Sequence, residues 1–148
     1  MTIESMASRK KMGDVYAAAT FVGPEGRQET LRLLVDTGST YTWIPAAVAR
    51  RLGLRALMVL PFDLGHRPYI RRRVGEAGVE ILGRRLTRLV VFARPNEEPV
   101  IGYDTLQGLL LHVDMIRHRL VPGGPLRAPS RRRIGVLPKR QTRRAARA

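Results

Sequence analysis

The chain has 148 residues, enough for one domain with a single core but not for two lobes of ordinary size. It contains no cysteine, which excludes disulfides, a thiolate nucleophile and a cysteine-based zinc site, and which fits a reducing, cytoplasmic setting. The formal charge is +15, yet residues 117–148 hold eleven of the 27 basic residues and no acidic one, which leaves 16 basic and 12 acidic residues, a charge of +4, before them. The excess charge therefore belongs to the C-terminal tail.

The N-terminal residues 1–13 are polar and basic, and we expect them to be a disordered extension. No apolar segment follows their basic residues, so neither a signal peptide nor a membrane span is predicted there. Met12 is a candidate start of the natural chain, beside Met1 and Met6. The folded domain is therefore expected to begin at residue 14.

The first half of the domain reads as strands joined by turn residues. Two β-rich stretches separated by a Gly-Pro-Glu-Gly turn predict a β-hairpin at 15–22 and 29–35. An extended segment follows at 41–44, and Pro45 at a first helical position begins a short helix that Gly53 ends. Strands at 54–61 and 69–74 then predict a protruding hairpin with its tip near Gly65. Its three consecutive arginines, at 71–73, are expected to be exposed.

The second half continues the same alternation of short elements. Glycines at 75, 78 and 83 are interpreted as turns, with strands at 79–82 and 86–92. A short strand, 100–102, leads into a helix, 103–110, capped by Asp104 or Thr105, and two last strands at 111–114 and 119–121 enclose a turn that contains Asp114. The sequence thus predicts one mostly β domain, residues 14–122, with two short helices and a basic disordered tail at 123–148.

Asp36 is the first candidate for chemistry. It directly follows the apolar residues Leu33-Leu34-Val35, and an ionised group resists leaving water unless it is hydrogen-bonded or needed. Gly38 lets the backbone fold beneath the carboxylate, and Thr37 brings a hydroxyl that can hold the turn. The alternative is a structural Asx-turn at the end of a strand.

Two segments together resemble the retropepsin-like, retroviral-type aspartic proteases and their bacterial single-domain relatives. They are Leu34-Val35-Asp36-Thr37-Gly38-Ser39 and, about sixty residues later, Val100-Ile101-Gly102-Tyr103-Asp104-Thr105-Leu106. The resemblance covers roughly residues 15–122. It implies a closed, barrel-like β fold in which Ile101 and Gly102 cross beside the Asp-bearing loop, and a flap in the hairpin at 60–74.

The same resemblance assigns roles to the residues of the loop. Asp36 is implied to be the catalytic carboxylate, Thr37 to hydrogen-bond to the other subunit, Gly38 to offer its backbone to the substrate, and Ser39 to support the loop. Candidates for the substrate groove are Tyr41, Trp43, Leu64, Gly65 and His66. For Tyr41 and Trp43 the alternative is packing in the core or at a dimer interface.

Peptide hydrolysis by this route needs two close carboxylates that share one proton. The chain has one Asp-Thr-Gly, and Asp104 and Asp114 are interpreted as a helix cap and a turn residue. A homodimer, with Asp36 facing its symmetry mate, is therefore expected to act on a peptide or protein substrate as an aspartic endopeptidase. No metal and no organic cofactor are called for, and the three histidines have no metal-ligand spacing.

Two other functions remain as alternatives. The fold could serve as a catalytically inactive peptide-binding module, or the Arg-rich tail could bind nucleic acid. The tail has no interleaved aromatic residues for base stacking and no apolar face for a membrane. Nucleic-acid binding is therefore possible but not favoured, and no membrane role is predicted.

Overall fold

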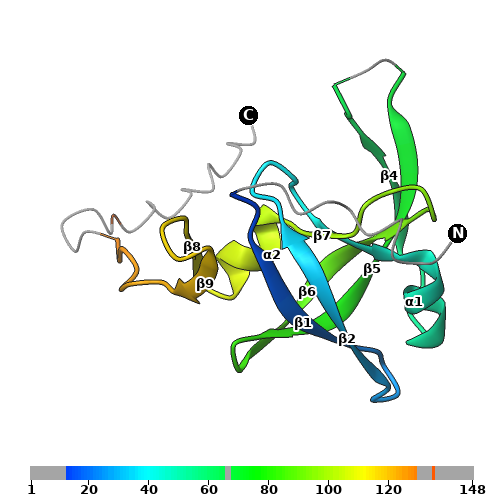
Figure 1. The fold of residues 1–148 in the computed structure, drawn as a ribbon. Helices are drawn as coiled ribbons and strands as arrows, with labels where there is room; N and C mark the ends of the chain where they lie inside the picture. The colour runs from blue at the N-terminus through cyan, green and yellow to red at the C-terminus, as the bar shows by residue number, and fades with distance from the viewer. Residues whose placement is uncertain (1–12, 66–67, 130–134, 136–148) are drawn as a thin grey trace, which may run out of the picture.

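A computed structural model of the chain describes residues 13–65, 68–129 and 135. The fold is mostly β with two short helices, as the sequence predicted (Figure 1). The expected N-terminal extension lies outside the described residues up to residue 12, and so does most of the basic tail. In chain order the elements are β1 (Tyr16–Val22), β2 (Gln28–Val35), β3 (Thr42–Pro45), α1 (Ala46–Arg51), β4 (Met58–Phe62), β5 (Ile70–Ile81), β6 (Arg84–Ala93), β7 (Val100–Ile101), α2 (Tyr103–Gly108), β8 (Leu111–Asp114) and β9 (Arg119–Pro122).

The main sheet closes on itself. Its strand order is β1-β2-β7-β3-β6-β5-β4, and β1 also pairs with β5, from Thr20 opposite Glu80 to Val22 opposite Gly78. Six strands therefore form a ring, and β4 lies outside it, where β5 is its one partner within the described part of the chain. The β4–β5 hairpin projects beyond the ring at the upper right of Figure 1. Strands β8 and β9 pair as a separate two-stranded sheet, at the predicted place in the chain.

The core fills the inside of this ring. Alternation along the strands turns side chains such as Phe21, Ile44 and Val79 inward, where none of their surface is exposed. Both helices add apolar residues to the same core, among them Leu52 just after α1 and Leu106 in α2. Burial of each such large side chain stabilises the fold by about 2 kcal/mol. A second cluster, around Trp43, Val74, Val91 and Val100, lies under the projecting hairpin.

Strand β5 departs most from the expectation. The glycines at 75 and 78 are not turns, because β5 runs through both without a break and only Gly83 lies in a turn, with φ +76°. A Cβ at Gly75 would lie 2.4 Å from the carbonyl oxygen of Arg55, so this glycine permits a close backbone approach. The expectation of three exposed arginines is also wrong, since Arg72 is buried.

The helix boundaries differ in smaller ways. Pro45 ends β3 and caps α1 instead of occupying its first turn, and the cap of α2 is Gly102, with no side-chain hydrogen bond. The side chains of Asp104 and Thr105 are used for other contacts, described below. The strand predicted to start at Leu54 begins at Met58. No helix within the described ranges is long and apolar enough to cross a membrane.

Candidate active site

The Asp36 loop begins where β2 leaves the ring. The backbone N–H of Asp36 donates to the carbonyl of Ile101 at 2.9 Å, which fixes the carboxylate beside β7. The N–H of Gly38 donates to Asp36 Oδ1 at 2.9 Å, and the N–H of Ser39 donates to the Asp36 carbonyl at 3.2 Å. The Asx-turn that was an alternative reading is thus present, and it orients a half-buried carboxylate rather than hiding it.

The start of α2, just after β7, is hydrogen-bonded to the C-terminal end of the Asp36 loop. The N–H of Tyr103 donates to the Ser39 carbonyl at 2.8 Å, and the N–H of Asp104 donates to the Thr40 carbonyl at 2.9 Å. Gly102 makes this contact possible, because a Cβ there would lie 2.1 Å from the carbonyl oxygen of Tyr41. The loop is therefore held by backbone contacts to residues about sixty positions away.

A buried pair of hydroxyl groups joins the two segments where β3 crosses the segment from β7 into α2. Thr42 Oγ1 and Thr105 Oγ1 are 2.6 Å apart, and neither residue is exposed to solvent. Thr42 Oγ1 also accepts the N–H of Gly102 at 3.0 Å. Sequence reasoning missed this pair and considered Thr105 only as an alternative to Asp104 for the cap of the helix. The available signal was a threonine in each of the two segments that cross, Thr42 between Tyr41 and Trp43 and Thr105 before Leu106.

An ion pair joins α2 to β6. Asp104 lies in the first turn of the helix and accepts two hydrogen bonds from Arg88 of β6. Arg88 Nη2 donates to Asp104 Oδ1 at 2.5 Å, and Arg88 Nε donates to Asp104 Oδ2 at 3.1 Å. Arg88 also donates to the backbone carbonyl of Asp104. Both oxygens of the Asp104 carboxylate are therefore engaged by a guanidinium.

A cavity of about 690 Å³ opens beside Asp36, between the loop and the hairpin. Apolar side chains form most of its wall, and Trp43 and Phe62 meet there edge to face, with ring centroids 5.0 Å apart. Trp43 is 8% exposed and packs in the second apolar cluster, and it also lines the cavity. It therefore has both positions considered for it, one in the core and one at the groove. The lining residues are Leu34, Asp36, Gly38, Ser39, Thr40, Tyr41, Trp43, Leu60, Pro61, Phe62, Asp63, Leu64, Ile70, Glu97, Glu98 and Val100.

Among the residues that the structure describes, every charged one that lines this groove is acidic, in a chain of net charge +15. Besides Asp36 they are Asp63 of the hairpin and the pair Glu97 and Glu98 before β7. The guanidinium of Arg72, hydrogen-bonded to Glu97, lowers the pKa of the Glu97 carboxyl despite its partial burial. Glu97 thus stays ionised at the edge of the groove.

The structure distributes the other predicted site residues as follows. Thr37 is exposed and lines a different cavity of about 390 Å³, together with residues of α2 and β8. Ile101 and Gly102 are buried behind the loop, and Gly65 is exposed in the hairpin turn but does not line the groove. His66 lies outside the described residues. Within the described ranges no group of three or more His, Asp or Glu residues could hold a metal ion.

The chain is similar to known proteins in sequence and in structure. A sequence model of the family described as "Aspartyl protease" matches residues 18–105. Among solved structures, the chain is similar to one described as EIAV protease complexed with the inhibitor HBY-793, at 16% identity, covering 69% of this chain and 93% of that chain, with a TM-score of 0.47. No curated protein matches. Because the family match spans more than half of the sequence, the chain belongs to the aspartyl protease family, as its two motifs predicted.

Proposed function

We propose that the protein is an aspartic endopeptidase that works as a homodimer, with Asp36 contributed by each subunit. The observation that carries the proposal is the placement of Asp36, held by β7 and facing a groove of about 690 Å³. Membership of the aspartyl protease family supports the same chemistry. The cysteine-free sequence supports a cytoplasmic location for the enzyme.

In this proposal the two Asp36 carboxyl groups share one proton, because like charges at close range do not both ionise. The ionised carboxylate takes a proton from a water molecule, whose oxygen attacks the peptide carbonyl carbon. The protonated carboxyl gives its proton to the carbonyl oxygen, and a tetrahedral diol forms. The carboxyl that now holds the proton gives it to the amide nitrogen, while the other carboxylate takes a proton from a hydroxyl of the diol. The C–N bond breaks, the amine and the carboxylic acid leave, and the pair again holds one proton.

The second carboxylate is assigned to a second copy because the chain has one Asp-Thr-Gly, and two of the three other acidic residues that line the groove are engaged in contacts of their own. Glu97 is ion-paired with Arg72, and Asp63 accepts the N–H of Gly65 at 2.8 Å in the hairpin turn. Thr37 and Gly38, the neighbours of Asp36, are exposed, so this side of the loop can meet another subunit. The adjacent apolar cavity of about 390 Å³, lined by residues such as Leu106 and Leu111, supports the same side for that contact.

The proposed substrate is an extended peptide bound beneath the hairpin. Among the described strands β4 pairs with β5 alone, so its other edge can pair with a peptide backbone. Leu60, Phe62 and Ile70 would then cover apolar side chains of the substrate. Closure of the hairpin would exclude water from the reacting bond.

Cleavage of a peptide library by wild type and by Asp36→Asn tests the proposal. Asp114→Asn is the matched control, because Asp114 accepts backbone N–H groups in the β8–β9 turn and an amide oxygen can do the same. Cleavage that Asp114→Asn retains and Asp36→Asn abolishes supports the enzyme. Peptide binding without turnover in the wild type would instead indicate the inactive binding module.

A further inference from the structure

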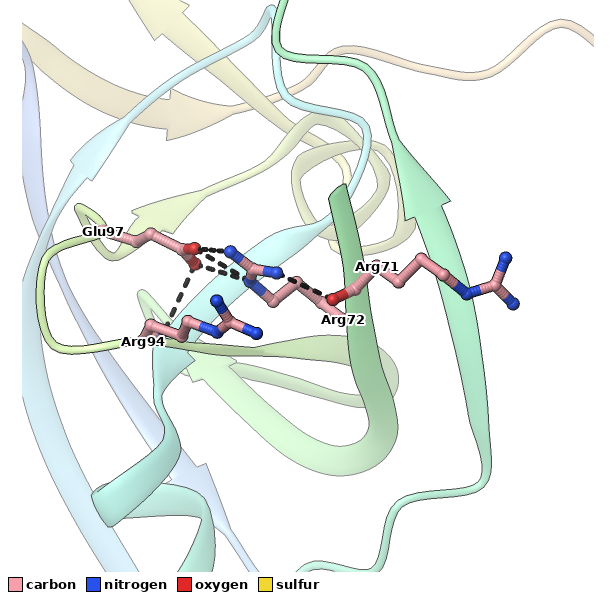
Figure 2. A network of polar contacts seen from close by, with 4 residues as sticks. All are labelled: Arg71, Arg72, Arg94 and Glu97. Carbon is pink, nitrogen blue, oxygen red and sulfur yellow. Dashed lines mark hydrogen bonds and ion pairs between the residues drawn. The ribbon is translucent and has the colours of Figure 1, made fainter. Parts of the chain in front are cut away.

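Arg72 and Glu97 form the most enclosed ion pair among the described residues. Their side chains are 9% and 17% exposed, whereas every partner in the other ion pairs is at least 26% exposed. Arg72 Nε donates to both oxygens of Glu97, at 2.8 Å and 3.1 Å, and Nη2 donates to Oε1 as well. Figure 2 shows the guanidinium and the carboxylate facing each other across the gap between their two backbones.

Both ends of the pair are also fixed to the backbone. Arg72 Nη1 donates to the Arg71 carbonyl at 2.7 Å, which ties the guanidinium to its own strand. Glu97 Oε2 accepts the N–H of Arg94 at 3.2 Å, and the N–H of Glu97 donates to the Arg94 carbonyl at 3.0 Å. Because both side chains are fixed to their own backbones, the ion pair connects strand β5 to the turn at 94–97 (Figure 2).

The two segments that it connects are two walls of the groove. Arg72 lies opposite Leu60 in the β4–β5 ladder and shares a face of β5 with Ile70, and both apolar residues line the groove. Glu97 and its neighbour Glu98 line the groove from the segment that enters β7. The hairpin extends beyond the ring here, since β4 pairs with β5 and with no other described strand.

The free energy of folding alone does not explain such a pair. The two charged groups lose hydration when they are enclosed, and apolar residues of similar size often stabilise a fold just as much as an enclosed ion pair does. An ion pair of this kind can, however, hold two segments in one defined position. A planar guanidinium does so through several directed N–H donors, whereas an apolar contact has no such directionality. We propose that the Arg72–Glu97 ion pair is a latch that positions the β4–β5 hairpin against the turn at 94–97 and thereby sets the width of the groove. As a role in catalysis, this rests on the function proposed above.

The chain carries a reporter for this latch that does not require activity. Trp43 is the single tryptophan, and its ring meets Phe62 of the hairpin at 5.0 Å. Movement of the hairpin changes the surroundings of the indole and shifts its emission to longer wavelength. Amide hydrogen exchange in β4 and at 70–74 reports opening of the same hairpin.

The experiment compares Glu97→Gln and the double variant Arg72→Met/Glu97→Gln with wild type. The double variant leaves no unpaired charge in the enclosed site, so the ring stays folded while the latch is absent. Glu80→Gln is the control, because it weakens the more exposed Glu80–Arg85 pair at the far end of the same strand. We expect hairpin amides to exchange at least about tenfold faster in both latch variants and not in the control. The Trp43 emission shifts with them, and KM rises about three- to tenfold with kcat within about twofold.

Unchanged hairpin exchange and unchanged Trp43 emission in the double variant would overturn the latch. Faster exchange spread equally over all strands would also overturn it, because the pair would then support the whole ring. If the wild type cleaves no peptide, the proposed function fails, while emission and exchange still decide whether the pair holds the hairpin. If cleavage is normal and KM is unchanged in a variant with an open hairpin, the latch has no role in setting the groove.

Discussion

Thr42 and Thr105 are 63 residues apart in the chain, yet their hydroxyl oxygens lie 2.6 Å apart in the interior. One threonine begins the strand that leaves the Asp36 loop, and the other lies in the helix that follows β7. Because Thr42 Oγ1 also accepts the N–H of Gly102, the pair satisfies the polar groups at the crossing of the two segments. The position of Asp36 thus depends on contacts that its own loop does not contain.

Replacing either threonine by valine removes a hydroxyl and keeps the shape. We expect Thr105→Val to lower the free energy of unfolding by about 1–2 kcal/mol, and Thr42→Val by about 2–3 kcal/mol because it also leaves the Gly102 N–H without an acceptor. Urea denaturation measures both changes. Thr20→Val is the matched control, since the Thr20–Thr30 hydroxyl pair is exposed and its loss changes stability by no more than about 0.5 kcal/mol. Equal losses at all three positions would contradict a special role for the buried pair.

Gly102→Ala places a methyl group where the Tyr41 carbonyl oxygen already lies, at 2.1 Å from the new Cβ. The backbone must separate there, so we expect a loss of about 3 kcal/mol or more in stability and weakened protection of the Asp36 N–H against hydrogen exchange. Gly124→Ala is the control, because no heavy atom lies within 4 Å of its added Cβ. A stable Gly102→Ala protein with normal protection at Asp36 would show that the crossing is not this tight.

Much of the fold could be predicted from local patterns. Alternation of apolar residues or turn residues within a short stretch is enough to predict several elements. These are the first hairpin, the Asp36 turn, the short strand before α2 and the last two strands. The course of β5 could not, because Gly75 resembles a turn residue locally. Its actual reason, the closeness of the Arg55 carbonyl, exists only in the folded chain.

The site divides in the same way. Asp36 and Gly102 could be found because their motifs are contiguous, whereas the groove wall at Glu97 and Glu98 carries no motif. Arg72 was assigned to an exposed triplet, although period-two alternation through 70–74 already places it on the face of Ile70 and Val74. Its partner is 25 residues away, in a turn whose position the sequence pattern does not determine.

The Arg72–Glu97 pair also predicts how stability changes with pH. Arg72, followed by the N–H and charge of Arg94, lowers the folded-state pKa of Glu97 below its ordinary value of 4.5. A carboxyl with a lowered pKa stabilises the fold fully above its unfolded pKa, and this contribution is lost as the pH falls through the folded pKa. We therefore expect the melting temperature to decline below about pH 4.5, and Glu97→Gln to flatten that decline. An identical decline in both proteins would assign the acid sensitivity to other groups, such as Glu29 beside Arg51.

The central claim is that two Asp36 carboxylates, one from each subunit, form a single active site. Mixing wild-type and Asp36→Asn subunits at constant total concentration, with time for exchange, tests it most directly. In an equal mixture only about one quarter of the dimers carry two Asp36 residues, so peptide cleavage should fall to about one quarter of the wild-type rate. A fall to about one half, in proportion to the wild-type subunits, would show that each subunit acts alone and would contradict the shared site.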